Sequence, residues 1–394
     1  MKKIGVCMMK KIGVCLLALA LAVFFAAPAA AEFDLYGSLR LITGWYNMDA
    51  EECGPDGPGA DYGVRDDNEL FWELCDISRF GARFSTGDIT ANVELGLKGE
   101  GHGNNSVYTR LLYGTWDFGA GSLKVGQDYP SYTIPSSQVA PRYDLGPKGT
   151  EAGRSLDGEN YFIGYGCLWE SRVPQVELKL ASGFFLTLLQ PETRSDGDIN
   201  RQLGVSDADV DKKVPKISVG YEYEGEGLCL SPGFAFNTYD VHVDSRDIDD
   251  RIDSYLIYLD GKAGLGPADI QWSLHYGQNL IDFGLWSREL AASAQFKDNG
   301  DVEDSQCYGG YLQVAFPVDP VTITVGTGYV ASKNDALGKG DVDDQMSYFV
   351  QAKIPLANTF YIVPEFSYYD QMEDASGYDE PEAWFLGLMW RMDF

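Results

Sequence analysis

Histidine is the side chain best suited to acid–base chemistry near neutral pH, and this sequence has three, His102, His242 and His275. His102 falls in a polar segment and His242 at the end of an apolar one, whereas Ser273 and His275 share one face of a predicted strand. No nucleophile elbow, paired-histidine metal motif or phosphate-binding loop is present in the sequence. The sequence therefore predicts no enzyme, no metal site and no cofactor.

Cysteine is the other residue type with reactive or metal-binding chemistry. Beyond residue 31 the cysteines are Cys53, Cys75, Cys167, Cys229 and Cys307, and their spacing matches neither a zinc site nor a haem-attachment motif. Cys53 and Cys75 flank one long polar segment, so an exported chain could join them in a disulfide. The other three fall in predicted strands and are expected to serve as small apolar side chains.

The charge of the chain is strongly negative, with 59 acidic and 30 basic residues and a formal net charge of −29. This charge argues against binding to nucleic acid or to anionic membrane surfaces through bulk electrostatics. The acidic residues are concentrated in the segments 49–76, 196–211, 240–253, 298–304, 335–344 and 370–382. We interpret these segments as solvated loops, and weak binding of divalent cations by a few of them is the alternative.

The first 31 residues have the pattern of a secretory signal peptide. Four lysines, at positions 2, 3, 10 and 11, precede a short apolar run at 16–25, and Ala29, Ala30 and Ala31 offer a cleavage site. We therefore expect the mature chain to begin at Glu32. Because the segment 2–7 recurs at 10–15, Met8 or Met9 could be the true initiator. No later run of about 20 apolar residues exists, so no membrane-spanning helix is predicted.

The last eleven residues alternate between two kinds of side chain. One face is apolar and consists of Trp384, Leu386, Leu388, Trp390, Met392 and Phe394. The other face is mixed and consists of Phe385, Gly387, Met389, Arg391 and Asp393. A period of two predicts a strand between two different environments. A soluble sheet could produce this pattern, but the length and the terminal aromatics are also typical of a membrane-spanning barrel strand.

Fifteen further segments are predicted to be strands, at 33–46, 74–85, 89–98, 107–118, 122–129, 159–169, 175–189, 214–224, 228–241, 252–264, 268–278, 305–316, 321–332, 345–355 and 359–370. Short Gly, Pro and Asn turns alternate along the chain with long, mostly acidic loops. Residues 32–394 are therefore predicted to form one all-β transmembrane antiparallel up-and-down β-barrel of sixteen strands, give or take two. The final strand must pair with the first, since an open edge is not tolerated in lipid.

The chain also resembles the general porins of Gram-negative outer membranes. The residues that carry this resemblance are the segments 35–40, 78–81, 109–114 and 124–127, together with the terminal Phe394. The resemblance implies a homotrimeric sixteen-stranded channel among outer-membrane lipids, with the third long loop folded into the lumen. Residues 130–158 occupy the place of that loop and carry mixed charges, among them Arg142, Asp144 and Glu151. Phe394 would be the signal that the barrel assembly machinery reads.

The alternation also predicts which side chains face the lumen. If Phe80, Phe84, Leu95 and Leu111 face lipid, then six basic residues face inward, namely Arg40, Arg79, Arg83, Lys98, Arg110 and Lys124. They could form a basic wall opposite the loop, or they could simply be solvated residues that balance nearby acids. The function favoured is passive diffusion of small hydrophilic solutes and ions. The alternative is a solute-specific channel with a saturable site for a sugar or an anion.

Overall fold

The structure is a computed structural model of the chain, and it describes residues 32–49, 67–75, 77–97, 107–139, 164–285, 292–297, 299–337, 342–377, 379–380 and 382–394. Nineteen strands form one antiparallel sheet: β1 (Glu32–Asp49), β2 (Asp67–Leu74), β3 (Arg79–Thr86), β4 (Ile89–Leu97), β5 (Val107–Asp117), β6 (Gly121–Asp128), β7 (Val173–Leu180), β8 (Phe184–Leu189), β9 (Ala208–Asp211), β10 (Lys216–Tyr221), β11 (Tyr223–Gly225), β12 (Leu228–Val243), β13 (Ile248–Gly264), β14 (Asp269–Gln278), β17 (Gln306–Val318), β18 (Val321–Lys333), β19 (Asp343–Ala357), β20 (Phe360–Asp370) and β21 (Glu382–Asp393).

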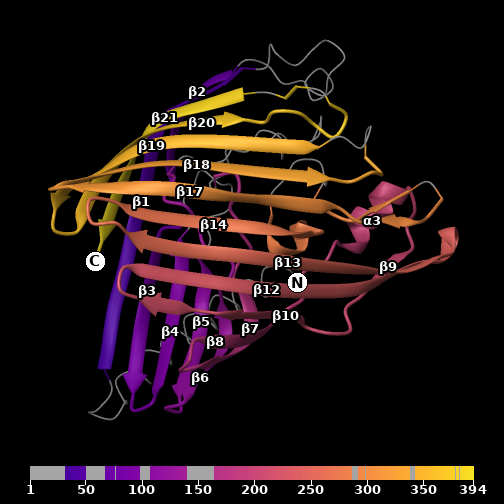
Figure 1. Ribbon diagram of the computed structural model, residues 1–394, viewed down its shortest axis with the longest axis horizontal. Coiled ribbons are helices and arrows are strands. Elements are labelled where there is room, and N and C mark those ends of the chain that lie inside the picture. Colours follow the sequence, from indigo (N-terminus) through magenta and orange to yellow (C-terminus); the bar gives the residue numbers. More distant parts are fainter. Residues whose placement is uncertain are drawn as a thin grey trace, which may run out of the picture.

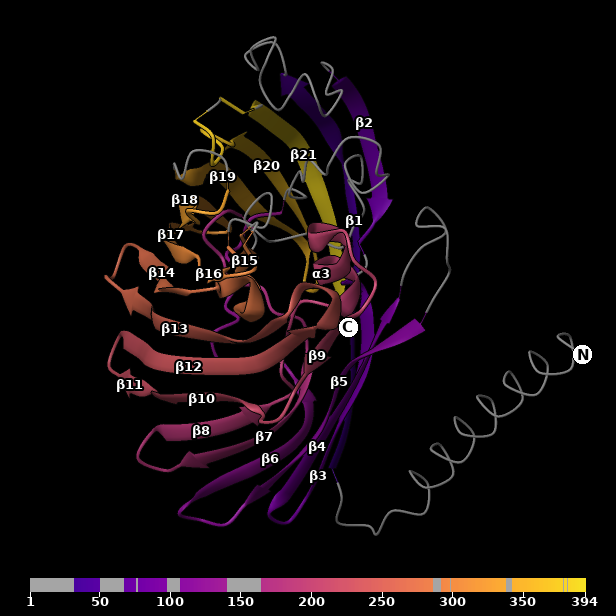
Figure 2. The same cartoon turned by 90° about the vertical axis from the view of Figure 1, so that its right-hand side faces the viewer.

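The sheet closes into a barrel, because β21 pairs with β1 along the register from Ser38 with Asp393 to Asp49 with Glu382. β2 and β3 both pair with β1 and together form one barrel strand, and β9, β10 and β11 together form another beside β12. Counted in this way the barrel has sixteen strands, which confirms the predicted fold and the predicted pairing of the last strand with the first. Figure 2 shows the strands following one another around the ring.

Two predicted strands are wrong. One is absent from the described residues and the other is in fact two strands, so the total of sixteen is unchanged. The described part of the segment 159–169 contains no strand, only a turn and one isolated bridge between Leu168 and Leu285. The segment 175–189, predicted as one strand, lies within the hairpin of β7 and β8, whose turn includes Gly183 at a φ of 101°. Glycine adopts a positive φ without strain, so Gly183 alone is enough to form this turn. The connection from β6 to β7 therefore runs from residue 129 to residue 172.

The acidic segment 240–253 is not an open loop, as predicted, but the end of a long hairpin. β12 and β13 pair through Val243 and Ile248, and the 3₁₀ helix η3 (Asp244–Arg246) lies between them. This hairpin projects at the right of Figure 1 beside β9 and the helix α3 (Asp196–Leu203). Ile199 of α3 packs with Val241, Phe296 and other apolar residues in a small core of its own. Phe296 belongs to a separate two-stranded sheet, formed by β15 (Gln295–Phe296) and β16 (Val302–Glu303).

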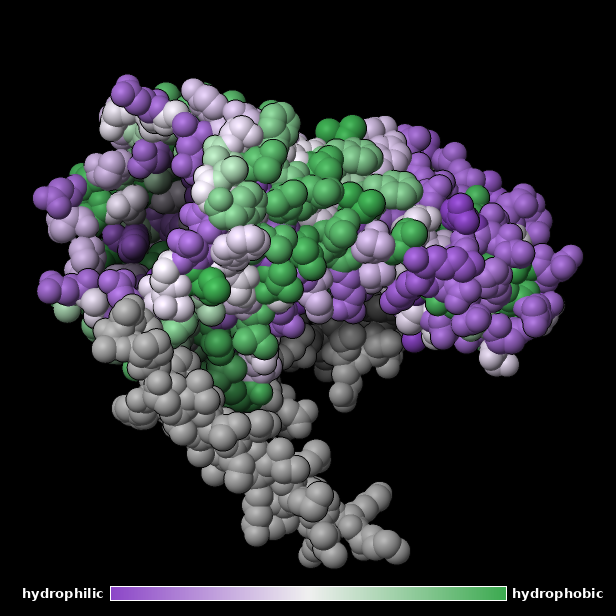
Figure 3. Space-filling model, turned by 90° about the horizontal axis from the view of Figure 1, so that it is seen from below, coloured by the Kyte–Doolittle hydropathy of each residue, from purple (hydrophilic) through white to green (hydrophobic). Residues whose placement is uncertain are grey.

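The two faces of the barrel strands differ in the way that the alternation predicts. On β21, Leu386 is 49% exposed at the outside, whereas Phe385 and Met389 are buried at the inside. Figure 3 shows an apolar area on the outer surface that hydrophilic residues flank on both sides. No helix in the described ranges is long and apolar enough to cross a membrane.

The closing seam between β1 and β21 depends on two small residues, Gly44 and Gly387, which are direct partners. A Cβ atom on Gly44 would lie 2.5 Å from the Gly387 Cα and 2.6 Å from the Leu386 carbonyl oxygen. We predict that Gly44→Ala destabilises the barrel by about 1–3 kcal/mol through overpacking. Samples are heated stepwise in detergent before loading, and the measurement is the temperature at which the band of the folded barrel disappears from the gel.

Gly114→Ala is the matched control for this prediction, because a Cβ atom there would have its nearest neighbour, the Thr90 carbonyl oxygen, at 3.7 Å. An unchanged melting temperature for Gly44→Ala would show that the seam can open by a few tenths of an ångström without cost.

Candidate functional site

The break between β2 and β3 sets the position of the first predicted basic residue, Arg40. Between these strands the chain leaves the ladder of β1, and the backbone N–H of Cys75 donates to the Arg40 carbonyl oxygen at 2.9 Å. The Ser78 Oγ accepts a hydrogen bond from the Arg40 N–H at 3.0 Å. The backbone of Arg40 is therefore satisfied although its neighbours have left the sheet. The same excursion places Ile77 inside the barrel, where it is buried.

A β-bulge sets the position of Arg110. The register of β4 with β5 shifts between Glu94 and Leu95, so that Glu94 pairs with Leu111 and Leu95 pairs with Thr109. One extra residue in β5 turns two consecutive side chains to the same face. As a result Arg110 and Leu111 both line the interior. The prediction that Leu111 faces lipid is therefore wrong, because alternation is interrupted at this point.

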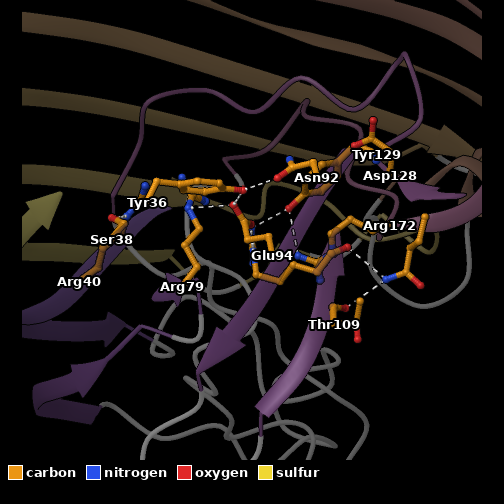
Figure 4. A network of polar contacts seen from close by, with 12 residues as sticks. Tyr36, Ser38, Arg40, Arg79, Asn92, Glu94, Thr109, Asp128, Tyr129 and Arg172 are labelled. Carbon is orange, nitrogen blue, oxygen red and sulfur yellow. Dashed lines mark hydrogen bonds and ion pairs between the residues drawn. The ribbon is translucent and has the colours of Figure 1, made fainter. Parts of the chain in front are cut away.

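Glu94 connects the basic residues of this wall, as Figure 4 shows. Its carboxylate lies 2.7 Å from the Arg110 Nε and 3.5 Å from the Arg79 Nε, and it accepts a hydrogen bond from the Tyr36 hydroxyl at 3.1 Å. The Arg110 guanidinium also donates to the Tyr129 hydroxyl at 3.0 Å. One buried acid therefore orients two arginines that come from different strands, as charge-assisted hydrogen bonds with fixed geometry do.

The connection between β6 and β7 enters the barrel, and both of its described arms contact the opposite wall. On the first arm, residues 129–139, the backbone N–H of Ser137 donates to the Gln313 side chain at 2.8 Å, and that of Val139 donates to the Glu365 carboxylate at 2.7 Å. On the second arm, residues 164–172, the Tyr165 N–H donates to Ser347 at 3.1 Å. These contacts with inward side chains narrow the bore, while residues 140–158 of the predicted constriction loop lie outside the described residues.

A fully buried lysine, Lys216, binds the second arm inside the barrel. The Lys216 Nζ lies 2.8 Å from the Glu170 carboxylate, which also accepts a hydrogen bond from Tyr132. Lys216 donates as well to the backbone of Asp282 in the 3₁₀ helix η4 (Leu280–Phe283). Burial raises the pKa of Asp282 to about 6, although hydrogen bonds from Ser254 and Asn237 and the charge of Lys216 oppose that rise. The loop after β14 and the second arm are thus joined inside the barrel.

Between the first arm and the walls lies a cavity of about 680 Å³. Five basic side chains line it, and they are Arg40, Arg79, Arg110, Lys353 and Arg391. Among the described residues that line it, Glu94 is the one acidic side chain. The other lining residues are either polar and uncharged, such as Ser136, Thr324 and Gln351, or apolar, such as Leu111 and Trp169. The charged side chains of the lining are therefore mostly basic, although Arg391 is paired with Asp393 at 2.9 Å.

The structure brings together only some of the residues that the sequence predicts to line the bore. Arg40, Arg79 and Arg110 line the cavity. Lys124 instead lies between Asp128 and Glu177, at 2.9 Å and 3.3 Å. Arg83 is exposed, lies 4.0 Å from Asp34 and does not line the cavity. The other predicted positions lie outside the described residues, and they are Lys98, Arg142, Asp144, Glu151 and Cys53.

Two other sequence-based expectations concern single residues. Lys353, which the sequence reasoning missed, has the same parity in β19 as Ser347 and Gln351, and this polar series would have indicated its inward direction. Ser273 and His275 are buried on β14 and do not belong to the described lining of the cavity.

We predict that Glu94→Gln destabilises the folded barrel by about 2–3 kcal/mol, because Arg79 and Arg110 then lose their buried counter-charge. The matched control is Asp34→Asn, which makes the same change in an exposed pair with Arg83 and should have little effect. The measurement is the denaturation midpoint in detergent. Equal midpoints for the two variants would show that Glu94 does not organise the wall.

No family model and no curated protein matches the sequence. The outer membrane channel DcaP of Acinetobacter baumannii has a TM-score of 0.62 at 15% identity, covering 93% of this chain and 99% of its own. The trimer form of OmpT from Vibrio cholerae has 0.51 at 15%, covering 93% and 100%, and Salmonella typhi OmpF in complex with daunomycin has 0.52 at 12%, covering 92% and 98%. The chain therefore has the sixteen-stranded barrel fold of the outer-membrane porins, as the resemblance implied.

Proposed function

We propose that this chain is a porin of the bacterial outer membrane, through which small hydrophilic solutes and ions diffuse passively. The observation that carries the proposal is the cavity inside the closed barrel, between the first arm and a wall of basic side chains. A passive channel needs a polar bore and a constriction that selects by size and charge, and it needs no reactive group. The basic lining favours anions over cations at the constriction.

The location and assembly of the protein belong to the same proposal. An apolar outer surface with side chains such as Trp45 and Leu386 suits a bilayer, and cleavage after Ala31 would leave Glu32 at the start of β1. Phe394 hydrogen-bonds through its backbone to Gly37, and its side chain is exposed, so the assembly machinery could reach it. We also propose a homotrimer, in line with the trimer form described for the OmpT neighbour.

A solute-specific channel is the second candidate, and one observation favours it. Four arginines and one lysine from different strands converge on one cavity, which is more than a non-selective bore needs. Saturation of solute flux at high concentration would support the specific channel, whereas flux proportional to concentration supports passive diffusion.

We predict that the purified protein inserts into planar bilayers in conductance steps that group in threes, because each trimer would carry three bores. The measurement is single-channel recording on protein whose folding has been checked by heat modifiability. A folded trimer without conductance would refute the channel function, and steps that occur singly would refute the trimer alone.

We predict that the channel is anion-selective and that the double variant Arg79→Gln/Lys353→Gln shifts the reversal potential in a salt gradient toward cations. Both side chains line the cavity, and Arg79 is partly buried, which weakens the screening of its charge by salt. Arg83→Gln removes the same kind of charge from the exposed site beside Asp34, and we expect a smaller shift there. If Arg83→Gln shifts the potential as much as the double variant does, charge at the rim and not the cavity determines selectivity.

A further inference from the structure

The two arms of the connection between β6 and β7 are joined to the barrel wall at one buried carboxylate, that of Glu170. Glu170 lies on the second arm and accepts a hydrogen bond from the Tyr132 hydroxyl of the first arm. The Lys216 Nζ, on β10, lies 2.8 Å from the same carboxylate. Lys216 is fully buried and Glu170 is 4% exposed. One buried ion pair therefore connects both arms to a single strand of the barrel.

Neighbouring contacts attach the arms to the same side of the barrel. On the first arm, the Ser131 hydroxyl lies 3.1 Å from the Ser218 hydroxyl of β10 and 3.0 Å from the Tyr258 hydroxyl of β13. On the second arm, the Trp169 N–H donates to the Gly284 carbonyl oxygen, directly after η4, at 2.8 Å. The ends of the arms nearest β6 and β7 are therefore fixed at β10, β13 and the loop after β14.

Adjacent residues on each arm have different surroundings. Thr133 and Trp169 line the cavity, whereas Tyr132 and Glu170, each one position away, are buried and are not among its described lining residues. The Tyr132 ring packs edge-on against the Phe283 ring of η4, with the ring centroids 5.7 Å apart. The Lys216–Glu170 ion pair therefore lies behind the arms, as seen from the cavity.

The charges make this attachment sensitive to the loss of either partner. A buried charge without its counter-charge is strongly destabilised, whereas a buried pair in which both partners become neutral is often no less stable. If Lys216 alone were neutral, the Glu170 carboxylate would regain hydration by moving away from the wall. The cavity that Trp169 borders lies directly beside the second arm, so this movement would carry the arm into the bore.

We propose that the Lys216–Glu170 ion pair is a positioning element that holds both arms back and keeps the bore open. This inference rests on the proposed channel function and adds to it the residues that maintain the width of the constriction. Lys216 contacts no solute and acts through Glu170 and Tyr132. Without the pair, the arms enter the cavity for short periods and interrupt the current.

The experiment records single channels of the full-length mature protein and of two variants in planar bilayers, after folding has been checked by heat modifiability. Lys216→Met keeps a similar size and leaves the Glu170 charge alone, so we expect brief closures and a several-fold larger fraction of closed time. In Lys216→Met/Glu170→Gln neither charge remains, and the Gln side chain can still accept from Tyr132. We expect its closed time to return toward that of the unaltered protein.

Lys179→Met is the matched control, because it makes the same change in a more exposed ion pair. Lys179 pairs with Glu222, and both side chains are 37% exposed. Water can replace the lost partner there, so the closed time should not change. Tyr132→Phe is a milder variant that keeps the ring and removes only the hydrogen bond from the first arm to Glu170. It should increase the closed time less than Lys216→Met does.

The outcomes separate this inference from the proposed function. A folded, unaltered protein that does not conduct overturns the channel function and the inference with it. The inference alone is overturned if Lys216→Met conducts as steadily as the unaltered protein, or if the double variant closes as often as Lys216→Met. Should Lys216→Met fail to fold, Tyr132→Phe decides, since a steady current through it overturns the inference and more frequent closures support it.

Discussion

The closed ring of main-chain hydrogen bonds is the constraint on which the rest of this structure depends. In a bilayer each unpaired backbone N–H or C=O costs several kcal/mol, so a sheet can span only if it has no free edge. The pairing of β1 with β21 closes the ring. Closure also fixes which side chains face inward, since a slip of one residue would exchange the two faces of a strand. The composition of the cavity thus follows from the register.

The places where the ring departs from regular pairing lie next to the cavity. The break between β2 and β3 lets Cys75 and Ser78 bind the backbone of Arg40. The bulge in β5 turns Arg110 and Leu111 to the same side. At the bulge, regular alternation would place either Arg110 or Leu111 outside, whereas the register shifts by two residues across the break and keeps the alternation. Breaks and bulges of this kind re-aim side chains at functional sites, while the neighbouring strands keep the barrel closed.

The sequence predicts the barrel well where lipid and water lie on opposite faces of a strand, as for the segments 321–332 and 359–370, which match β18 and β20 closely. The segment 159–169 misled the prediction because its apolar residues, such as Leu168, pack inside the lumen and not against lipid. Parity indicated the direction of Arg40, Arg79 and Arg110. It failed at Leu111, where the bulge is set by pairing with β4, and only closure of the ring reveals that Lys353 lies near the arginines.

In the proposed channel, the acidic hairpin and the basic cavity would favour opposite ions, and screening by salt would decide which of the two has the larger effect on transport. Charges such as Asp249 and Asp250 at the end of the hairpin are exposed, and physiological salt reduces their influence beyond about 8 Å. The arginines of the cavity are buried or partly buried, where the effective dielectric constant is lower and fewer counter-ions enter. In the proposed channel, the acidic surface would therefore change the local ion concentration outside, whereas a solute in the cavity would meet a mostly basic set of charged side chains.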